Sequence, residues 1–388
     1  MKILTFVNIS NIDDIESDSG YIFNYLLAQE FSKKHKYKVV LPELLKKKTT
    51  TKFDADSIYY AKIGVTKYQA RYSFDWDNIC EIIRHYSPDI IFLNQCELAS
   101  AMKSLLLTIS MKKIKVVTYC HYPALHYSDN DVILDYSLND AGLCENILMN
   151  ILSSINVSDA FITQSDFSKT MILKFADKYN YYLNKSIDIV CPPFDPFLLN
   201  REIDLERKKS KKILYNHRLY ASYGTEKFLN FVSNHPNLMF SVSDPMPNRN
   251  KNNIRKKFNN TPLQYKEKLS TLKNVEIFNG GENRHLYKKI LEDSYIAIAP
   301  YREACVWSMS VIDCFCLGIP VVAPNFAAYK EFIWSDLLYN DDKQFNDLVI
   351  KLLNNKTFYK KAVETSYAFL DNITPSKIAN KILKCLEK

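Results

Sequence analysis

The sequence predicts an α/β protein with two Rossmann-like domains, each built on a parallel sheet that helices cover on both faces. Short runs rich in Val, Ile, Leu and Phe alternate with longer segments of helical periodicity along most of the chain. A Pro-rich and then charged stretch at 191–212 interrupts the alternation, and a second series of strands and helices follows it. The chain has 388 residues, which is enough for two hydrophobic cores.

The first series of elements is expected before the Pro-rich stretch. Its predicted strands are 2–9, 37–43, 88–95, 114–123, 157–165 and 186–193. Its predicted helices are 20–35, 76–87, 97–113, 139–156 and 165–180. Because the strands are almost continuously apolar, we expect the sheet to be buried on both faces.

The second series begins at 212. Its predicted strands are 212–219, 235–243, 274–281, 295–301 and 319–325, and its predicted helices include 285–295 and 308–317. The strand at 319–325 is expected to be the last, with helices after it. The resulting domains are 1–195 and 212–372, joined by a linker at 196–211, with a C-terminal helix at 373–388 that can pack back on the first domain.

The composition limits the cellular context and the partners. No run of about 18 apolar residues exists, and "MKILTFVNIS" at 1–10 is typical of a strand, so we expect a cytoplasmic protein. The net charge is +8, and Lys-rich clusters lie at 44–52, 206–212 and 249–258. These clusters can bind nucleic acid or an anionic membrane, or they can be solvated loops of a sequence rich in Lys, Asn, Ile and Tyr.

Several common site motifs are missing. The sequence has no G-x-G-x-x-G after a strand, no P-loop and no G-x-S-x-G elbow. Three D-x-D strings, at 54–56, 75–77 and 129–131, lie in polar loops or just before a helix. Helix caps and turns explain these strings better than a metal site, so no metal is expected.

Ligands of doubly wound sheets bind beyond the carboxyl ends of the strands, near helix N-termini. This rule selects five loops, which contain Ser19 and Gly20, His121, His217 and Arg218, Gly280 and Gly281, and residues 301–310. At the end of the last loop, Ser308 or Ser310 can cap the helix that follows. The free N–H groups and the dipole of that helix would suit a phosphate.

Three residues in or next to these loops have both a functional and a structural interpretation. Asp313 lies about a turn and a half inside the last helix and can accept hydrogen bonds from a ribose, or it can be a dipole partner, with Trp307 packed in the core. Arg218 can hold a diphosphate or form a surface ion pair. His121 can orient a sugar hydroxyl or be a core histidine.

The combination of features resembles a known group of enzymes. The features are the two Rossmann-like domains, the helix opened by Gly20, Arg218 after the first strand of the second domain, and Asp313 before "GIPVVAPN" at 318–325. They are similar to the GT-B glycosyltransferases, in particular the retaining family 4 group. The resemblance covers nearly the whole chain and is most specific over 274–333.

The resemblance assigns roles to particular positions. Asp313 matches the second Glu of the family's E-x7-E pair, which contacts the ribose. The first Glu falls on Cys305, so either Glu303 reaches the donor sugar through a shifted loop or the sugar is held differently. The family's diphosphate-binding Lys falls on Tyr223, so Arg218 would act with Lys227 or with Arg302.

The resemblance implies a retaining, metal-independent glycosyltransferase that moves a sugar from a nucleotide sugar, such as a UDP- or GDP-sugar, to an acceptor hydroxyl. No cofactor is implied. The first domain would bind the acceptor and the second the nucleotide sugar. The implied catalytic residues are His121, Arg218 and Glu303, and the implied nucleotide-sugar-binding residues are Gly20, Asn216, Arg218, Lys227, Gly281, Trp307, Ser308, Met309, Ser310 and Asp313.

Three hypotheses remain for the biological role. Most family 4 enzymes make cell-envelope glycans or glycolipids, which implies a glycan or lipid-linked acceptor and peripheral contact with the inner membrane face. The strings "ILYNHR" and "APNFAAYKEF" are similar to the tRNA-queuosine mannosyltransferase branch, which implies a hydroxylated or modified base in DNA or tRNA as the acceptor. The third hypothesis is a non-catalytic GT-B binding module, in which Cys305 and Tyr223 reflect lost activity.

Overall fold

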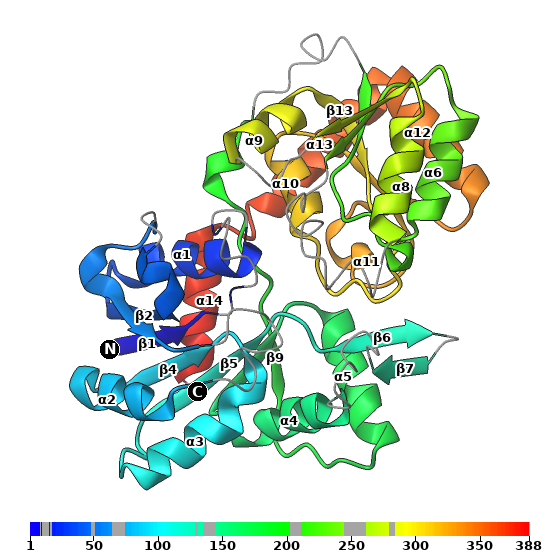
Figure 1. Cartoon of the computed structure of the whole chain (residues 1–388). Helices are drawn as coiled ribbons and strands as arrows, with labels where there is room; N and C mark the ends of the chain where they lie inside the picture. The colour runs from blue at the N-terminus through cyan, green and yellow to red at the C-terminus, as the bar shows by residue number, and fades with distance from the viewer. Residues whose placement is uncertain are drawn as a thin grey trace. The chain divides into compact units, whose positions relative to one another are not determined.

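The computed structural model consists of two compact units (Figure 1). Unit 1 comprises Met1–Pro193 and Thr374–Lys388, and unit 2 comprises Phe194–Ile373. The structure describes residues 1–7, 9, 15, 18–47, 51–63, 74–128, 131–134, 144–201, 211–243, 261–278 and 284–387. Most of the predicted linker, at 202–210, therefore lies outside the described residues.

Unit 1 has a seven-stranded sheet in the order β3-β2-β1-β4-β5-β8-β9, and every neighbouring pair is parallel. Its strands are β1 (Lys2–Phe6), β2 (Lys36–Pro42), β3 (Ile58–Ala61), β4 (Ile90–Leu93), β5 (Lys115–Cys120), β8 (Ala160–Thr163) and β9 (Ile187–Ile189). Its helices are α1 (Ser19–Phe31), α2 (Trp76–Tyr86), α3 (Ala99–Thr108), α4 (Cys144–Val157), α5 (Asp166–Lys178) and α14 (Pro375–Glu387).

The layers of unit 1 follow from its apolar pattern. β4 and β8 are buried at every position, as expected for strands covered on both faces. α2 and α3 pack on one face of the sheet, where Ile79, Ile82 and Ile83 join a core with the central strands. The C-terminal helix α14 belongs to unit 1 and packs on α1 (Figure 1).

Helix α2 illustrates how the sequence sets an element. Its buried residues Ile79, Ile82, Ile83 and Tyr86 recur at helical spacing and form one apolar stripe. Asp75 caps the helix, since its Oδ1 accepts the backbone N–H of Asn78 at 3.1 Å. The helix ends where the next residue turns into the left-handed conformation.

Unit 2 has a six-stranded parallel sheet in the order β12-β11-β10-β13-β14-β15. Its strands are β10 (Lys212–Tyr215), β11 (Phe240–Ser243), β12 (Val275–Phe278), β13 (Ser294–Ile298), β14 (Val321–Pro324) and β15 (Leu338–Tyr339). Its helices are α6 (Thr225–Asn234), α8 (Thr261–Ser270), α9 (Arg284–Glu292), α10 (Met309–Cys316), α11 (Tyr329–Phe332), α12 (Asp342–Asn354) and α13 (Lys356–Leu370).

The predicted α/β class with two parallel sheets is confirmed, and a few elements differ from expectation. The strand predicted at 114–123 ends at Cys120, and an antiparallel hairpin of β6 (Leu125–Ser128) and β7 (Asp131–Leu134) follows it. The strand at 319–325 is not the last, because the two residues of β15 pair with β14. Two residues are too few to give a periodic signal.

The strand order places the reversal of each sheet beside its first strand. In unit 1 the chain moves outward from β1 to β2 and β3, then returns to β4 on the other side of β1. In unit 2 the same reversal lies between β10 and β13. Such switch points open a crevice at the carboxyl ends of the strands, so the loops after β1, β4, β10 and β13 are the expected ligand positions.

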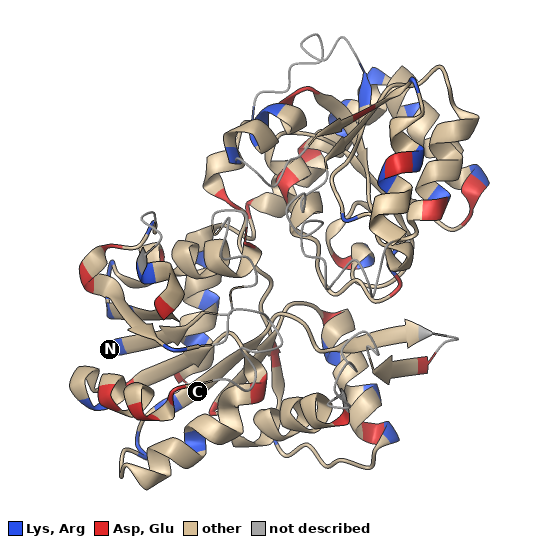
Figure 2. Cartoon of the chain, in the orientation of Figure 1, with Lys and Arg blue, Asp and Glu red and all other residues tan. Residues whose placement is uncertain are grey.

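The surface charges are mixed. Lys and Arg are interspersed with Asp and Glu along the helices of both units (Figure 2). The Lys-rich cluster at 249–258, most of the one at 206–212 and residues 48–50 lie outside the described residues. No helix in the part of the chain that the structure describes is long and apolar enough to cross a lipid bilayer.

Gly318 ends α10 in a conformation that favours glycine, with φ at +63°. An added Cβ would lie 2.5 Å from the hydroxyl oxygen of Tyr367. Gly318→Ala is therefore expected to lower the free energy of unfolding by about 2–4 kcal/mol, from backbone strain and overpacking. Urea unfolding measures the loss, and Thr357→Ala, in the exposed first turn of α13, is the control with a change below about 0.5 kcal/mol. Equal stability of the two variants would show that a side chain at position 318 is tolerated without strain.

Candidate functional site

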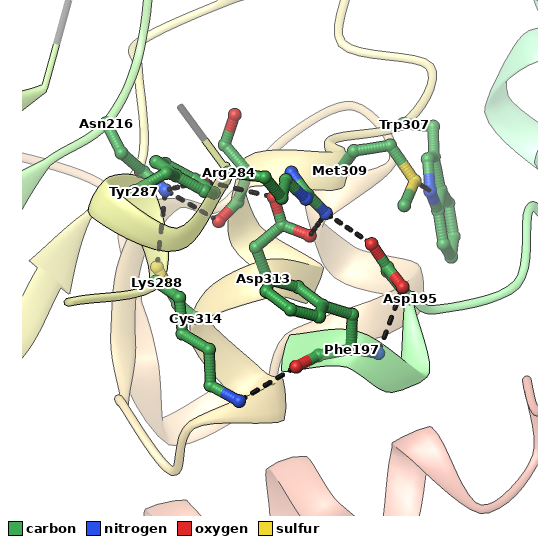
Figure 3. A network of polar contacts seen from close by, with 11 residues as sticks. Asp195, Phe197, Asn216, Arg284, Tyr287, Lys288, Trp307, Met309, Asp313 and Cys314 are labelled. Atoms are coloured by element: carbon green, nitrogen blue, oxygen red, sulfur yellow. Dashed lines mark hydrogen bonds and ion pairs between the residues drawn. The ribbon is translucent and has the colours of Figure 1, made fainter. Parts of the chain in front are cut away.

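A buried polar cluster lies at the carboxyl edge of the unit 2 sheet (Figure 3). Asn216 follows β10, and its Nδ2 donates to the hydroxyl of Tyr287 at 2.9 Å and to the carbonyl oxygen of Ser310 at 3.0 Å. The Tyr287 hydroxyl in turn donates to Oδ2 of Asp313 at 3.0 Å. β10, α9 and α10 thus bring together three of the predicted site residues, Asn216, Ser310 and Asp313.

Arg284 connects this cluster to a second carboxylate. Its guanidinium lies 2.7 Å from Oδ2 of Asp195 and 4.0 Å from Oδ1 of Asp313 (Figure 3). Asp195 is fixed as the cap of a short 3-10 helix, Pro196–Leu198, where its Oδ1 accepts the N–H of Phe197 at 3.0 Å. The side chains are 15% exposed for Arg284 and 8% for each carboxylate. One buried cation therefore lies between two buried carboxylates and offsets the charge of only one of them.

The protonation states of the cluster follow from burial and from the excess of carboxylates over cations. Burial, together with the charge of Asp195, raises the pKa of Asp313 to about 6, although Arg284 and the Tyr287 hydrogen bond act against the rise. Burial alone would lower the pKa of Arg284, but the two carboxylates outweigh it and raise that pKa. Burial and the charge of Asp313 raise the pKa of Tyr287 well above its usual range, so its hydroxyl remains a donor.

Two acceptor oxygens of the cluster have no hydrogen-bond donor among the described residues. They are Oδ1 of Asp313 and Oδ1 of Asn216, and both are buried. A buried acceptor without a donor is uncommon, because the group has lost its water. The Arg284 guanidinium attracts Oδ1 of Asp313 across 4.0 Å without bonding to it. The cluster can therefore accept further hydrogen bonds.

Helix α10 begins directly beside this cluster. Ser308 occupies the predicted cap position, but its side chain makes no capping hydrogen bond, and Ser310 lies within the first turn instead. Trp307 packs on Phe332 with ring centroids 4.9 Å apart, and its Nε1 donates to the sulfur of Met309 at 3.2 Å. Trp307 is thus a core residue, which was the structural alternative for this position.

The loop between β13 and α10 contains Cys305 and Glu303, the two residues considered for the role of the first Glu, and they differ in burial. Cys305 is buried, and burial raises the pKa of its thiol. Glu303 is exposed. Among the described residues, no contact brings either side chain to Asp313, and Gly281 lies outside the described ranges.

Three cations follow β10 and β13, and each lies over an aromatic ring. The Arg302 guanidinium is 5.1 Å from the Tyr223 ring, the Lys227 ammonium is 3.6 Å from the Tyr301 ring, and the Arg218 guanidinium is 5.9 Å from the ring of Tyr220. Arg302 also acts on the buried His217: burial, and then this charge, lower the pKa of His217 to about 3. His217 is therefore neutral at physiological pH.

Gly20 and His121 belong to unit 1. The N–H of Gly20 donates to Oδ1 of the capping residue Asp18 at 2.9 Å, so this N–H already has an acceptor. His121 follows β5, is half-buried, and its Nε2 lies 2.9 Å from Oδ1 of Asn94. The rings of Phe23 and Tyr119 pack against it, with centroids 4.7 Å and 4.6 Å away.

Sequence reasoning missed five residues of these clusters: Asn24, Asn94, Asp195, Arg284 and Tyr287. Nδ2 of Asn94 also donates to Oδ1 of Asn24 at 2.7 Å. Asn94 directly follows β4 at the switch point, so the rule that selected the other loops also selects it. Asp195 lies between two prolines, in the stretch whose composition indicates a connection between domains. Tyr287 and Arg284 lie in the first turns of α9 and show no motif.

The D-x-D strings serve local structure where they are described. Asp75 caps α2, and Asp54 occupies the cap position of a 3-10 helix, as the turn and cap interpretation predicts. Asp131 forms an ion pair with Lys178. Within the described ranges, no group of three or more His, Cys, Asp or Glu side chains is arranged to hold a metal ion.

Arg284→Met would leave two buried carboxylates without their cation. We expect a loss of about 3–5 kcal/mol in the free energy of unfolding of unit 2, because the remaining charges are desolvated. Trp307 and Trp334 report on this unit alone in a Trp76→Phe background, so urea unfolding followed by fluorescence measures the loss.

Arg201→Met is the matched control, because Arg201 pairs with Asp371 at the surface of the same unit. It should cost less than about 1 kcal/mol. Adding Asp195→Asn to Arg284→Met should restore part of the loss. A cost for Arg284→Met no greater than that of Arg201→Met would refute the buried-network description.

The raised pKa of Asp313 makes the stability of unit 2 depend on pH. The folded protein binds this proton more tightly than the unfolded chain, so the stabilisation is complete below about pH 4 and is lost as the pH rises through about 6. Asp313→Asn cannot titrate. From about pH 4 to 7, the wild-type free energy of unfolding should fall by up to about 3 kcal/mol relative to the variant. Parallel pH profiles in urea unfolding would show that Asp313 has an ordinary pKa.

Comparison with known proteins gives structural neighbours only. No protein-family model matches the chain, and no curated protein matches it. The structure of HepE from Anabaena in complex with UDP-glucose is 10% identical, with a TM-score of 0.68 over 100% of this chain and 99% of that chain. Sucrose-phosphate synthase from Thermosynechococcus elongatus is 12% identical, with a TM-score of 0.72 over 100% and 98% of the two chains.

A third neighbour is UDP-GlcNAc 2-epimerase from Neisseria meningitidis, bound to UDP-GlcNAc. It is 14% identical, with a TM-score of 0.54 over the whole of both chains. Identities this low establish the fold alone. The chain has the GT-B fold, as its sequence predicts.

Proposed function

We propose that the protein is a glycosyltransferase that moves a sugar from a nucleotide-sugar donor to an acceptor hydroxyl, with the nucleotide bound by unit 2. The observation that carries this proposal is Asp313, a buried carboxylate whose Oδ1 lacks a hydrogen-bond donor among the described residues. A ribose hydroxyl would supply that donor and would stabilise the ionised form that burial disfavours. The neighbours crystallised with UDP or UDP-sugars support the same ligand class.

We propose that Arg302 takes the role of the diphosphate-binding Lys of the family that the sequence resembles. Tyr223 occupies the position of that Lys, and the guanidinium of Arg302 lies over its ring. The ammonium of Lys227 lies on the Tyr301 ring instead. We therefore propose that Arg218 and Arg302 hold the diphosphate, since a guanidinium presents a fork of donors to phosphate oxygens.

The finer description of the reaction rests on the family 4 resemblance. It comprises retention of configuration, metal independence and an acceptor in cell-envelope glycan or glycolipid synthesis. The structures of HepE with UDP and glucose and of an S. aureus TarM variant with α-GlcNAc-glycerol and UDP support a sugar or glycan acceptor. A base in DNA or tRNA is the alternative. Nucleic-acid binding that falls steeply with salt would favour it.

Substitution of either arginine should weaken diphosphate binding specifically. Arg218→Met and Arg302→Met are each expected to reduce affinity for UDP or GDP, whichever the parent binds, by about 10- to 100-fold, because a charged hydrogen-bond partner is lost. Lys227→Met should stay within about 3-fold as the matched cation control. Titration calorimetry measures the affinities, and the parent nucleoside lacking phosphates should show no difference among the variants. Unchanged diphosphate affinity in Arg302→Met would remove Arg302 from the site.

The reaction itself is tested with a panel of uridine and guanosine sugar nucleotides. Incubation with lipid-linked and free glycan acceptors should release the nucleoside diphosphate and add one sugar mass to an acceptor, as detected by mass spectrometry. An isomerised nucleotide sugar would instead indicate epimerase chemistry on the same fold. Failure of every sugar nucleotide to bind would favour a non-catalytic module.

A further inference from the structure

Unit 1 contains a chain of three hydrogen-bonded side chains at the carboxyl edge of its sheet. It runs from Asn24 on α1 to Asn94 after β4 and to His121 after β5. Nδ2 of Asn94 lies 2.7 Å from Oδ1 of Asn24, and Oδ1 of Asn94 lies 2.9 Å from Nε2 of His121. Both asparagines are at most 2% exposed, so water does not share these bonds.

Backbone carbonyls fix the orientation of both amides. Nδ2 of Asn24 donates to the carbonyl oxygen of Gly20 at 2.7 Å, which turns its Oδ1 toward Asn94. Nδ2 of Asn94 donates to the carbonyl oxygen of Phe6 at 3.2 Å as well as to Asn24. A carbonyl oxygen can only accept, so neither amide can be rotated end for end without opposing two acceptors.

The fixed amides determine where the imidazole carries its proton. Oδ1 of Asn94 faces Nε2 of His121, and an amide oxygen cannot donate. Nε2 must therefore be the protonated nitrogen, since two lone pairs at this distance would repel. In the neutral ring Nδ1 then carries the lone pair. The packed rings of Phe23 and Tyr119 restrict rotation of the imidazole.

We propose that Asn24 and Asn94 are positioning residues that hold neutral His121 as the Nε2–H tautomer, which makes Nδ1 the hydrogen-bond acceptor of the ring. In the proposed glycosyl transfer, on which this part of the inference rests, the imidazole held in this tautomer orients a sugar hydroxyl. The amide chain acts through His121 and does not itself touch the substrate.

Nitrogen NMR of the full chain with 15N-labelled histidine tests the tautomer directly. At about pH 8.5, above the ordinary imidazole pKa, His121 should show a pyrrole-type Nε2 and a pyridine-type Nδ1. His121→Gln assigns the signals. A pyrrole-type Nδ1, or two averaged nitrogens, would overturn the inference. This measurement needs no variant that alters the amide chain.

Asn94→Ala tests whether the amide is the cause. The two nitrogen shifts of His121 should move toward each other by at least about half of their wild-type separation, because the tautomers then interconvert. His126 is the internal control, since its Nδ1 accepts the backbone N–H of Tyr127 at 2.9 Å independently of Asn94. Asn146→Ala is the matched variant, because Asn146 and Asn150 form an Asn–Asn bond of 2.8 Å at the surface. Unchanged His121 shifts in a folded Asn94→Ala would refute the assigned role.

Activity separates this inference from the proposed function. Asn94→Ala should bind the nucleoside diphosphate as the parent does and transfer sugar about 10- to 100-fold more slowly. Wild-type His121 in the Nε2–H form without any sugar transfer would refute the proposed function alone. Sugar transfer by a protein whose His121 is the Nδ1–H tautomer would refute the inference alone.

Discussion

The ion pairs of Arg284 are the constraint on which the geometry of the unit 2 cluster depends. Its guanidinium joins Asp195, which is capped into a short 3-10 helix, to Asp313 on α10. With both carboxylates ionised, the cluster buries one uncompensated negative charge. A buried charge of this kind is unfavourable, so Asp313 binds a proton more readily than an exposed Asp. The same imbalance makes hydroxyl donors favourable ligands for its unpartnered oxygen.

Unit 1 has a buried polar chain that fixes the orientation of a side chain without using charged groups. Two asparagines donate to fixed backbone carbonyls there, Asn94 to that of Phe6 at the end of β1 and Asn24 to that of Gly20 in the first turn of α1. A neutral amide keeps its donor and acceptor ends at any pH at which the protein is folded, whereas a carboxylate changes when it titrates. The two amides therefore hold His121 in the same way at every pH at which the protein is folded.

The alternation of apolar strands and helices was sufficient to predict the class and the two sheets, because burial on both faces leaves a strong local signal. The carboxyl-end rule also selected the loops that directly adjoin Asn216 and the helix of Asp313. Arg284 and Asp195 could not be predicted, because they are 89 residues apart and meet only in the folded chain. Trp307 and Met309 adjoin the site in sequence, but whether such a residue faces the core or a ligand depends on packing that periodicity does not record.

Two positions differ from the pattern of the family 4 enzymes that the sequence resembles, and the structure gives each a local role. Cys305 at the first Glu position is buried, and its carbonyl accepts the N–H of Ala328 at 3.0 Å, so this position supports the loop before α10. A buried Glu there would need a partner of its own. By that resemblance Tyr223 stands where a Lys is expected, and its ring supports the guanidinium of Arg302, which places positive charge at the same edge. Because the fold is shared with an epimerase as well as with transferases, such side-chain chemistry, rather than the fold, determines which reaction the site can perform.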